Sequence, residues 1–134
     1  MWRVAGDHWD DWSLRDQPGV GTKEVIGMSE GMSRYSGKAG GWNDLDYLYT
    51  GLKTQQQSRH MADGQTENEY RTAFSFWCLL QSPIIFTVDV RQLFPWQIHV
   101  LSNRELLRIN QDVCDDAVQG DLLLRNEPLI CPGK

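Results

Sequence analysis

Apolar side chains recur at helical spacing between residues 66 and 82, and this is the clearest periodic pattern in the chain. The apolar face comprises Tyr70, Ala73, Phe74, Trp77 and Leu80. Thr66 and Glu69 form a capping box at the start of this pattern, because the Thr66 hydroxyl can accept from the Glu69 amide while the carboxylate reaches back. Pro83 stops the pattern. We therefore expect a mostly buried helix that begins after Thr66.

Two shorter helices are expected after it. Pro95 suits a first helical residue, since its fixed φ matches a helix and its missing N–H is not needed there, so a helix to Leu101 is predicted. Ser102 to Glu105 is a second capping box, for a helix that carries Leu106, Leu107 and Ile109. Residues 110–112, Asn-Gln-Asp, end this helical pattern.

Three stretches are predicted as strands. Residues 84–88 are short and almost entirely apolar, as in a parallel sheet covered on both faces, and Trp2 to Val4 resemble the end of another strand. Residues 42–49 also fit a buried strand, within which Asp44 and Asp46 would share one face because side chains alternate. Two carboxylates in such a place are costly unless they are hydrogen-bonded, paired or catalytic.

The remaining segments carry weaker patterns. Residues 10–14 place Asp10 and Asp11 ahead of Trp12 and Leu14, which predicts a first helical turn. Residues 22–39 are rich in Gly, Ser, Lys and Met without a sustained period, so we predict mostly loop. Residues 113–134 contain several turn formers and predict a turn-rich tail with one strand at 122–124.

The order strand, helix, strand, helix, strand, helix indicates an α/β fold of βα units with right-handed crossovers. Three visible strands are too few to close a barrel of eight. Two architectures therefore stay open, a small open sheet or the last part of a (β/α)8 barrel.

Composition narrows the classes of partner. The chain has 134 residues, 40% hydrophobic, and a formal net charge of −5 at pH 7. It fits one small domain or a piece of a larger one, and its acidic balance argues against nucleic acid or an anionic membrane, which both require a basic face. The apolar run of residues 74–88 is broken by Gln81, Ser82 and Pro83, so no membrane span is expected, and residues 1–7 turn polar too early for a signal peptide.

Cysteine and histidine positions predict no metal site. The three cysteines show no C-x-x-C spacing and no nearby histidine pattern, and the acidic residues around His8 match neither an EF-hand nor a zinc site. Cys78 lies in an apolar helical pattern and is predicted as a buried free thiol. Cys114 and Cys131 can pair across a short loop if the protein is secreted, and this alternative stays open.

Six stretches between residues 2 and 112 occur in the order of a known set of motifs. They are Trp2-Arg3-x-x-Gly6-Asp7-x-Trp9-Asp10, Gly40-Gly41-Trp42-Asn43-Asp44-x-Asp46, Glu69-Tyr70-Arg71 leading into Phe74-Ser75-x-Trp77, Ser82-Pro83-Ile84, Asp89-Val90-Arg91, and Leu101-Ser102-Asn103 through Ile109-Asn110-Gln111-Asp112. In these stretches the chain resembles the α-galactosidase (melibiase) family, family 27 of the glycoside hydrolases. The resemblance implies the C-terminal portion, about three βα units, of a (β/α)8 TIM barrel, incomplete in this chain. Residues 1–112 would belong to the barrel, and residues 113–134 would be a tail, either the start of a C-terminal β region or an irregular extension.

The resemblance also implies a site. In this family hydrolysis retains the anomeric configuration and uses two aspartates, a nucleophile and a general acid/base. By motif the acid/base is Asp7, a position where an isolated carboxylate would otherwise fit a helix cap or a solvated loop. Arg3 is implied to hold a sugar hydroxyl and to influence Asp7. Tyr47 is implied in substrate binding, because it stands where a Met commonly lines the sugar pocket.

Trp42, Asp44 and Asp46 are implied as supporting residues of the pocket floor, with direct sugar binding by the two aspartates as the alternative. Leu45 departs from the family, which usually has Pro at this position.

The implied function is part of a retaining α-galactosidase that hydrolyses terminal non-reducing α-D-galactose residues, without cofactor or metal. Nothing in the chain matches the nucleophile motif, which lies upstream in the family, so we expect the isolated polypeptide to be inactive and Met1 to reflect a truncated gene model or a fragment. The alternative is a catalytically inactive carbohydrate-binding or remnant protein of the same family. The family implies a secreted or lysosomal location, and galactose or N-acetylgalactosamine specificity stays open.

Overall fold

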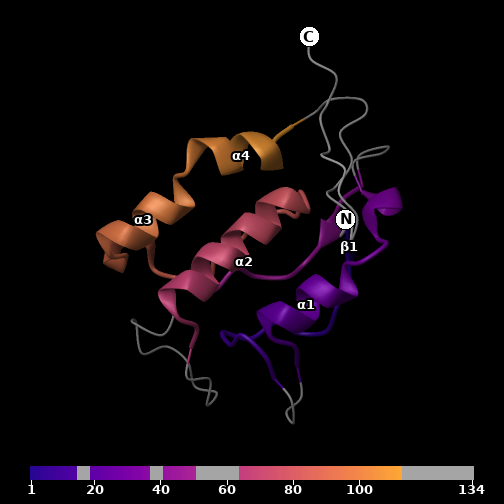
Figure 1. Cartoon of the computed structure of the whole chain (residues 1–134), viewed down its shortest axis with the longest axis horizontal. Helices are drawn as coiled ribbons and strands as arrows, with labels where there is room; N and C mark the ends of the chain where they lie inside the picture. Colours follow the sequence, from indigo (N-terminus) through magenta and orange to yellow (C-terminus); the bar gives the residue numbers. More distant parts are fainter. Residues whose placement is uncertain (15–18, 37–40, 51–63, 113–134) are drawn as a thin grey trace.

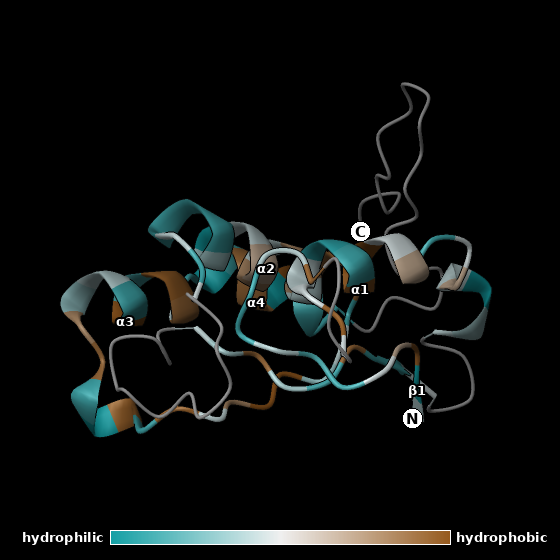
Figure 2. Ribbon diagram, turned by 90° about the horizontal axis from the view of Figure 1, so that it is seen from below, coloured by the Kyte–Doolittle hydropathy of each residue, from teal (hydrophilic) through white to brown (hydrophobic). Residues whose placement is uncertain are grey.

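The computed structural model describes residues 1–14, 19–36, 41–50 and 64–112. The elements, in chain order, are β1 (Trp2–Arg3), α1 (Thr22–Met28), a 3-10 helix (Ser33–Tyr35), β2 (Asn43–Asp44), α2 (Glu67–Leu79), a second 3-10 helix (Val90–Gln92), α3 (Pro95–Leu101) and α4 (Arg104–Asn110). The helices form one layer, and the extended segments run along one side of that layer (Figure 2). The predicted tail of residues 113–134, including its strand and the pairing of Cys114 with Cys131, lies outside the described residues.

Three extended segments pair in parallel, in the order of the chain. β1 lies beside β2 with Trp2 opposite Asn43, and the Val4 amide donates to the Asp44 carbonyl over 3.0 Å. Further along, Leu48 forms a parallel bridge with Phe86, and its amide donates to the Ile85 carbonyl over 2.8 Å. The predicted α/β class is therefore confirmed, with parallel pairing between successive extended segments.

The strand predicted over residues 42–49 is wrong in its extent. Asp46 has a φ of 75°, in the left-handed region, so β2 stops at Asp44 and the chain returns to a bridge only at Leu48. Oδ1 of Asp44 accepts from the Asp46 amide over 2.9 Å, a local bond that competes with strand pairing. Asp44 and Asp46 therefore do not share one face of a regular strand. The strand predicted over residues 84–88 is likewise reduced to the bridge at Phe86.

The helices predicted from local signals after residue 64 are confirmed. Thr66 caps α2, accepting from the Glu69 amide, and the Glu69 carboxylate accepts from the Thr66 amide over 2.7 Å. α3 begins at Pro95. α4 begins one residue later than the predicted capping box implies, because Asn103, and not Ser102, accepts from the first amides of the helix.

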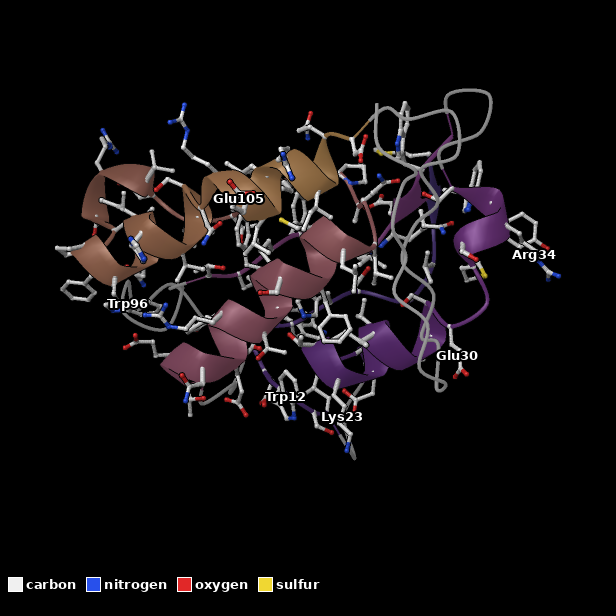
Figure 3. All side chains as sticks on the ribbon, turned by 45° about the horizontal axis from the view of Figure 1, so that its top comes forward. Trp12, Lys23, Glu30, Arg34, Trp96 and Glu105 are labelled. Carbon is white, nitrogen blue, oxygen red and sulfur yellow. The ribbon has the colours of Figure 1, made fainter. Side chains whose placement is uncertain are left out.

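Both predictions between residues 10 and 39 fail where the structure describes them. Residues 10–12 form bends and residues 13–14 have no regular structure, and the helix α1 lies within the predicted loop. Oε2 of Glu24 accepts from the Gly21 amide over 3.0 Å and from the Leu14 amide over 3.2 Å, so one carboxylate caps α1 and holds the bends against it. In Figure 3 the labelled side chains of Lys23, Glu30 and Arg34 point outward from this region. A seven-residue helix with a glycine cap leaves almost no sequence signal.

The core lies between α2 and the extended segments. Phe74, Trp77 and Cys78 of α2 are fully buried together with Leu45 and Leu48, and α2 also packs against α3 and α4 (Figure 1). The prediction of Cys78 as a buried free thiol is confirmed, and burial raises the pKa of this thiol to about 12. Among the described residues, no helix has both the length and the apolar character needed to cross a membrane.

Candidate active site

The guanidinium of Arg3 joins two carboxylates that are distant in sequence. Nη2 of Arg3 donates to Oδ1 of Asp7 over 3.3 Å, to the Gly6 carbonyl over 3.3 Å, and to Oδ2 of Asp46. Arg3 ends β1 and Asp46 follows β2, so parallel pairing brings the carboxyl ends of the two strands to one edge, where ligands bind in α/β sheets. Three of the residues singled out in the sequence thus come together.

The two carboxylates differ in their access to solvent. The Asp7 side chain is 82% exposed, whereas that of Asp46 is 9% exposed, and Arg3 between them is 38% exposed. Asp7 is therefore the carboxylate that an external ligand can reach, and Asp46 is placed to hold the residues around it.

Asp46 is held on every side. Its amide donates to Asp44, its carbonyl accepts from Nε1 of Trp77 over 3.2 Å, and its Oδ2 accepts from the His8 amide over 2.8 Å as well as from Arg3. A non-glycine residue with positive φ persists only where its surroundings determine it, and such residues cluster at ligand sites. The geometry after β2 is therefore fixed by contacts from three separate segments.

His8 is a central residue of this region that sequence reasoning considered only for metal binding. The residue is 1% exposed, with Nδ1 2.8 Å from the Tyr47 carbonyl and Nε2 3.1 Å from Oγ1 of Thr22. The rings of Tyr49 and Trp77 lie 5.2 Å from it, centroid to centroid. Burial lowers the pKa of His8 below its usual value of 6.5, against the opposing effects of the Tyr47 carbonyl and the Asp46 charge.

A buried polar chain continues from His8 toward α2. Oγ1 of Thr22 donates to Oε1 of Gln65 over 2.9 Å, and Nε2 of Gln65 donates to Oδ1 of Asp10 over 3.4 Å. The Tyr70 hydroxyl donates to Oδ2 of Asp10 over 2.8 Å. These partners lie up to 60 residues apart, so no local pattern marks Asp10 or His8 as buried.

Negative charge gathers around Tyr49. Burial, together with the charges of Asp46, Asp10 and Asp7, raises the pKa of Tyr49 to about 12. The phenol, which is protonated at neutral pH even at its usual pKa, therefore keeps its proton into more alkaline solution.

Two further predicted site residues, Tyr47 and Trp42, have exposed side chains. Tyr47 is 45% exposed and Trp42 is 41% exposed. The contacts described for them run through their backbones, since the Tyr47 carbonyl faces His8 and the Trp42 carbonyl accepts from the Trp2 amide over 3.2 Å. Their side chains are thus open to solvent.

Asp89 and Arg91, at the end of the third extended segment, form a separate pair. Asp89 accepts from the Arg91 guanidinium over 2.9 and 2.8 Å and from the Arg91 amide over 3.1 Å, and these bonds hold the pKa of Asp89 well below its usual range. Asp89 caps the 3-10 helix at Val90–Gln92. Within the described ranges, no three His, Cys, Asp or Glu side chains are grouped so as to hold a metal ion.

Comparison with known proteins identifies relatives of this chain. The family model described as "Alpha galactosidase A" matches residues 1–112. The alpha-galactosidase mel1 of Schizosaccharomyces pombe is 31% identical over 126 residues, covering 84% of this chain and 27% of that protein. An alpha-galactosidase of Oryza sativa subsp. japonica is 34% identical over 111 residues, covering 83% of this chain and 22% of the relative.

Solved structures agree with these sequence relatives. A Bacteroides fragilis protein provisionally assigned as an alpha-galactosidase/melibiase superposes with a TM-score of 0.81 at 31% identity, covering 94% of this chain and 26% of that one. Alpha-galactosidase I from Mortierella vinacea superposes with a TM-score of 0.70 at 27% identity, covering 84% and 29%. The chain thus spans about a quarter of the length of the curated relatives it matches.

Proposed function

Because the chain belongs to the alpha-galactosidase (melibiase) family, we propose that it is part of a retaining α-galactosidase that hydrolyses terminal non-reducing α-D-galactose residues. Residues 1–112 would form the C-terminal portion, about three βα units, of a (β/α)8 barrel. The parallel pairing of three successive extended segments supports this placement.

Asp7 is the proposed general acid/base. The observation that carries this assignment is the Arg3 guanidinium between a solvent-facing Asp7 and a covered Asp46, at the edge where the strands end. Asp7 would protonate the leaving oxygen and then take a proton from the attacking water. The nucleophile would come from a strand outside this chain, roughly 5 Å from Asp7, as retention requires.

Arg3 and Tyr47 are the proposed substrate-binding residues. The bonds described for Arg3 all use Nη2, so Nη1 and Nε can donate to a sugar hydroxyl. The exposed ring of Tyr47 can cover an apolar face of the sugar. Trp42, Asp44 and Asp46 support these groups, with Asp44 acting through the Asp46 amide.

A second candidate function is a non-catalytic carbohydrate-binding or remnant protein. It is favoured by the exposed rings of Trp2, Trp42 and Tyr47. Such rings suit sugar stacking without hydrolysis.

The test uses the reading frame extended upstream of Met1. An in-frame strand that ends in Asp, preceded by further βα units, supports the enzyme, and a genuine stop codon supports the remnant.

In the extended protein, Asp7→Asn should lower turnover of a natural galacto-oligosaccharide by roughly 10²- to 10⁴-fold. Turnover of a nitrophenyl α-galactoside should fall less, because an activated phenol needs less protonation. Asp11→Asn, a neighbouring acid, is the matched control. Near-normal turnover by Asp7→Asn would overturn the assignment.

A further inference from the structure

We propose that His8 is a positioning residue, which uses Nδ1–H to fix the main chain of Asp7 relative to Tyr47. The inference rests on the proposed function, because it takes Asp7 and Tyr47 as parts of one galactoside site. His8 itself is buried, so its effect must pass through its neighbours.

The peptide bond between Asp7 and His8 is held at both of its polar ends. The Asp7 carbonyl accepts from the Val20 amide over 2.9 Å, and the His8 amide donates to Oδ2 of Asp46 over 2.8 Å. Asp7 is therefore exposed at its carboxylate and fixed at its backbone. A carboxylate that is free to reach a ligand keeps its aim only if its backbone cannot shift.

The His8 ring connects this fixed backbone to Tyr47, the proposed substrate-binding residue. Its Nδ1 meets the Tyr47 carbonyl at 2.8 Å, and Tyr47 directly follows Asp46, the residue that holds the His8 amide. One residue thus makes two bonds, from backbone and ring, to two consecutive residues after β2. The distance between the Asp7 backbone and the Tyr47 backbone is set by this pair of bonds.

The chemistry of the partners determines the proton position. A carbonyl oxygen only accepts, so Nδ1 of His8 must carry a proton whether the ring is neutral or cationic. Burial lowers the pKa of His8, so the ring is neutral at neutral pH and Nε2 presents a lone pair to Thr22. The Thr22 hydroxyl then has one proton for two acceptors, Nε2 of His8 and Oε1 of Gln65. The Nδ1 bond is therefore the one that orients the ring in both states.

The charged groups facing His8 come from three segments. Asp46 favours the cation, Arg3 opposes it, and Glu24 at the start of α1 favours it. None of them changes the identity of the Nδ1 partner, so the proposal does not depend on the charge of the ring.

The first test is spectroscopic and uses the 134-residue chain. Long-range ¹H–¹⁵N correlation of the histidine side chains should show His8 with Nδ1 protonated and Nε2 unprotonated near pH 7.5, and with Nδ1 still protonated at lower pH. The His8→Asn variant identifies the signals by removing them, while those of His60 and His99 stay. A neutral ring protonated at Nε2 alone would overturn the proposal.

The second test uses the extended protein and two isosteric variants. The amide nitrogen of Asn occupies roughly the place of Nδ1, whereas that of Gln reaches the place of Nε2. We expect His8→Asn to keep most of kcat and His8→Gln to lose on the order of 10- to 100-fold, with a smaller change in KM. Equal losses in the two variants, at equal unfolding midpoints, would overturn the role of Nδ1.

A double-mutant cycle separates this inference from the function on which it rests. If His8 acts through Asp7, His8→Gln should cost little more once Asp7→Asn is present. Full multiplicative losses would show that His8 acts elsewhere. Normal turnover by Asp7→Asn alone would instead reject the proposed acid/base, while the spectroscopic test would still decide the bond between His8 and Tyr47.

Discussion

Asp46 stabilises the site through more bonds than its sequence position suggests. Its side chain accepts from Arg3 and from the His8 amide at a backbone φ of 75°. Asp46→Ala should lower the free energy of unfolding by about 1–3 kcal/mol, because a partly buried amide and a guanidinium lose their acceptor. Asp46→Asn should lose less, since Asn keeps an acceptor oxygen and tolerates positive φ. Urea unfolding of both variants measures the difference, and equal stability of Ala and Asn would contradict it.

His8 should make stability depend on pH in the mildly acidic range. Burial lowers its pKa in the folded chain below 6.5, so the unfolded chain takes up the proton first. Stability is then complete above about pH 6.5 and falls as the pH drops toward the lower folded pKa. His8→Asn should flatten this decline in urea unfolding series at pH 7.5 and 5.5. His99→Asn, at an exposed position, should leave the decline as it is, and an unchanged slope in His8→Asn would refute the assignment.

At the scale of elements, α2 depends on a cap that lies entirely within four residues. The Thr66 hydroxyl accepts from the Glu69 amide over 3.3 Å, and the Glu69 carboxylate closes the box. Thr66→Ala should cost about 0.5–2 kcal/mol of unfolding free energy. Thr72→Ala is the matched control in mid-helix, where Thr72 bonds the Asn68 carbonyl and Ala has the higher helix propensity. Comparable losses in the two variants, by thermal or urea unfolding, would show that the cap contributes nothing special.

The difference between local and long-range contacts explains which elements could be predicted from the sequence. α2 and α3 were predictable because Thr66, Glu69 and Pro95 act on residues within one turn. The end of β2 was not, because Asp46 is turned by contacts from Arg3, His8 and Trp77, up to 43 residues away. The grouping of Arg3 with Asp7 was implied by the family motif that contains both residues. The burial of His8 was not, since its partners belong to α1 and to the segment after β2.

At the scale of the whole molecule, the helix layer and the extended segments are joined by polar side chains as well as by the apolar core. Oγ of Ser82, just after α2, accepts from the Leu45 amide over 3.1 Å. Nδ2 of Asn110, at the end of α4, donates to the Ser82 carbonyl over 3.0 Å and to the Trp77 carbonyl over 3.3 Å. These bonds connect α4, the end of α2 and the segment after β2 that carries Asp46.

Asn110→Ala should therefore affect the site segment at a distance. Removing the amide leaves two buried carbonyls without this donor, which should cost about 1–3 kcal/mol of unfolding free energy. Because Ser82 also holds Leu45, the Leu45 amide should exchange with solvent faster in the variant than the loss of global stability alone explains. Exchange of amides in mid-α2 should rise no more than that global loss explains. Asn68→Ala, an exposed position on α2, is the control and should change neither quantity. A stability loss with unchanged relative protection at Leu45 would show that α4 stabilises the fold without reaching the residues around Asp46.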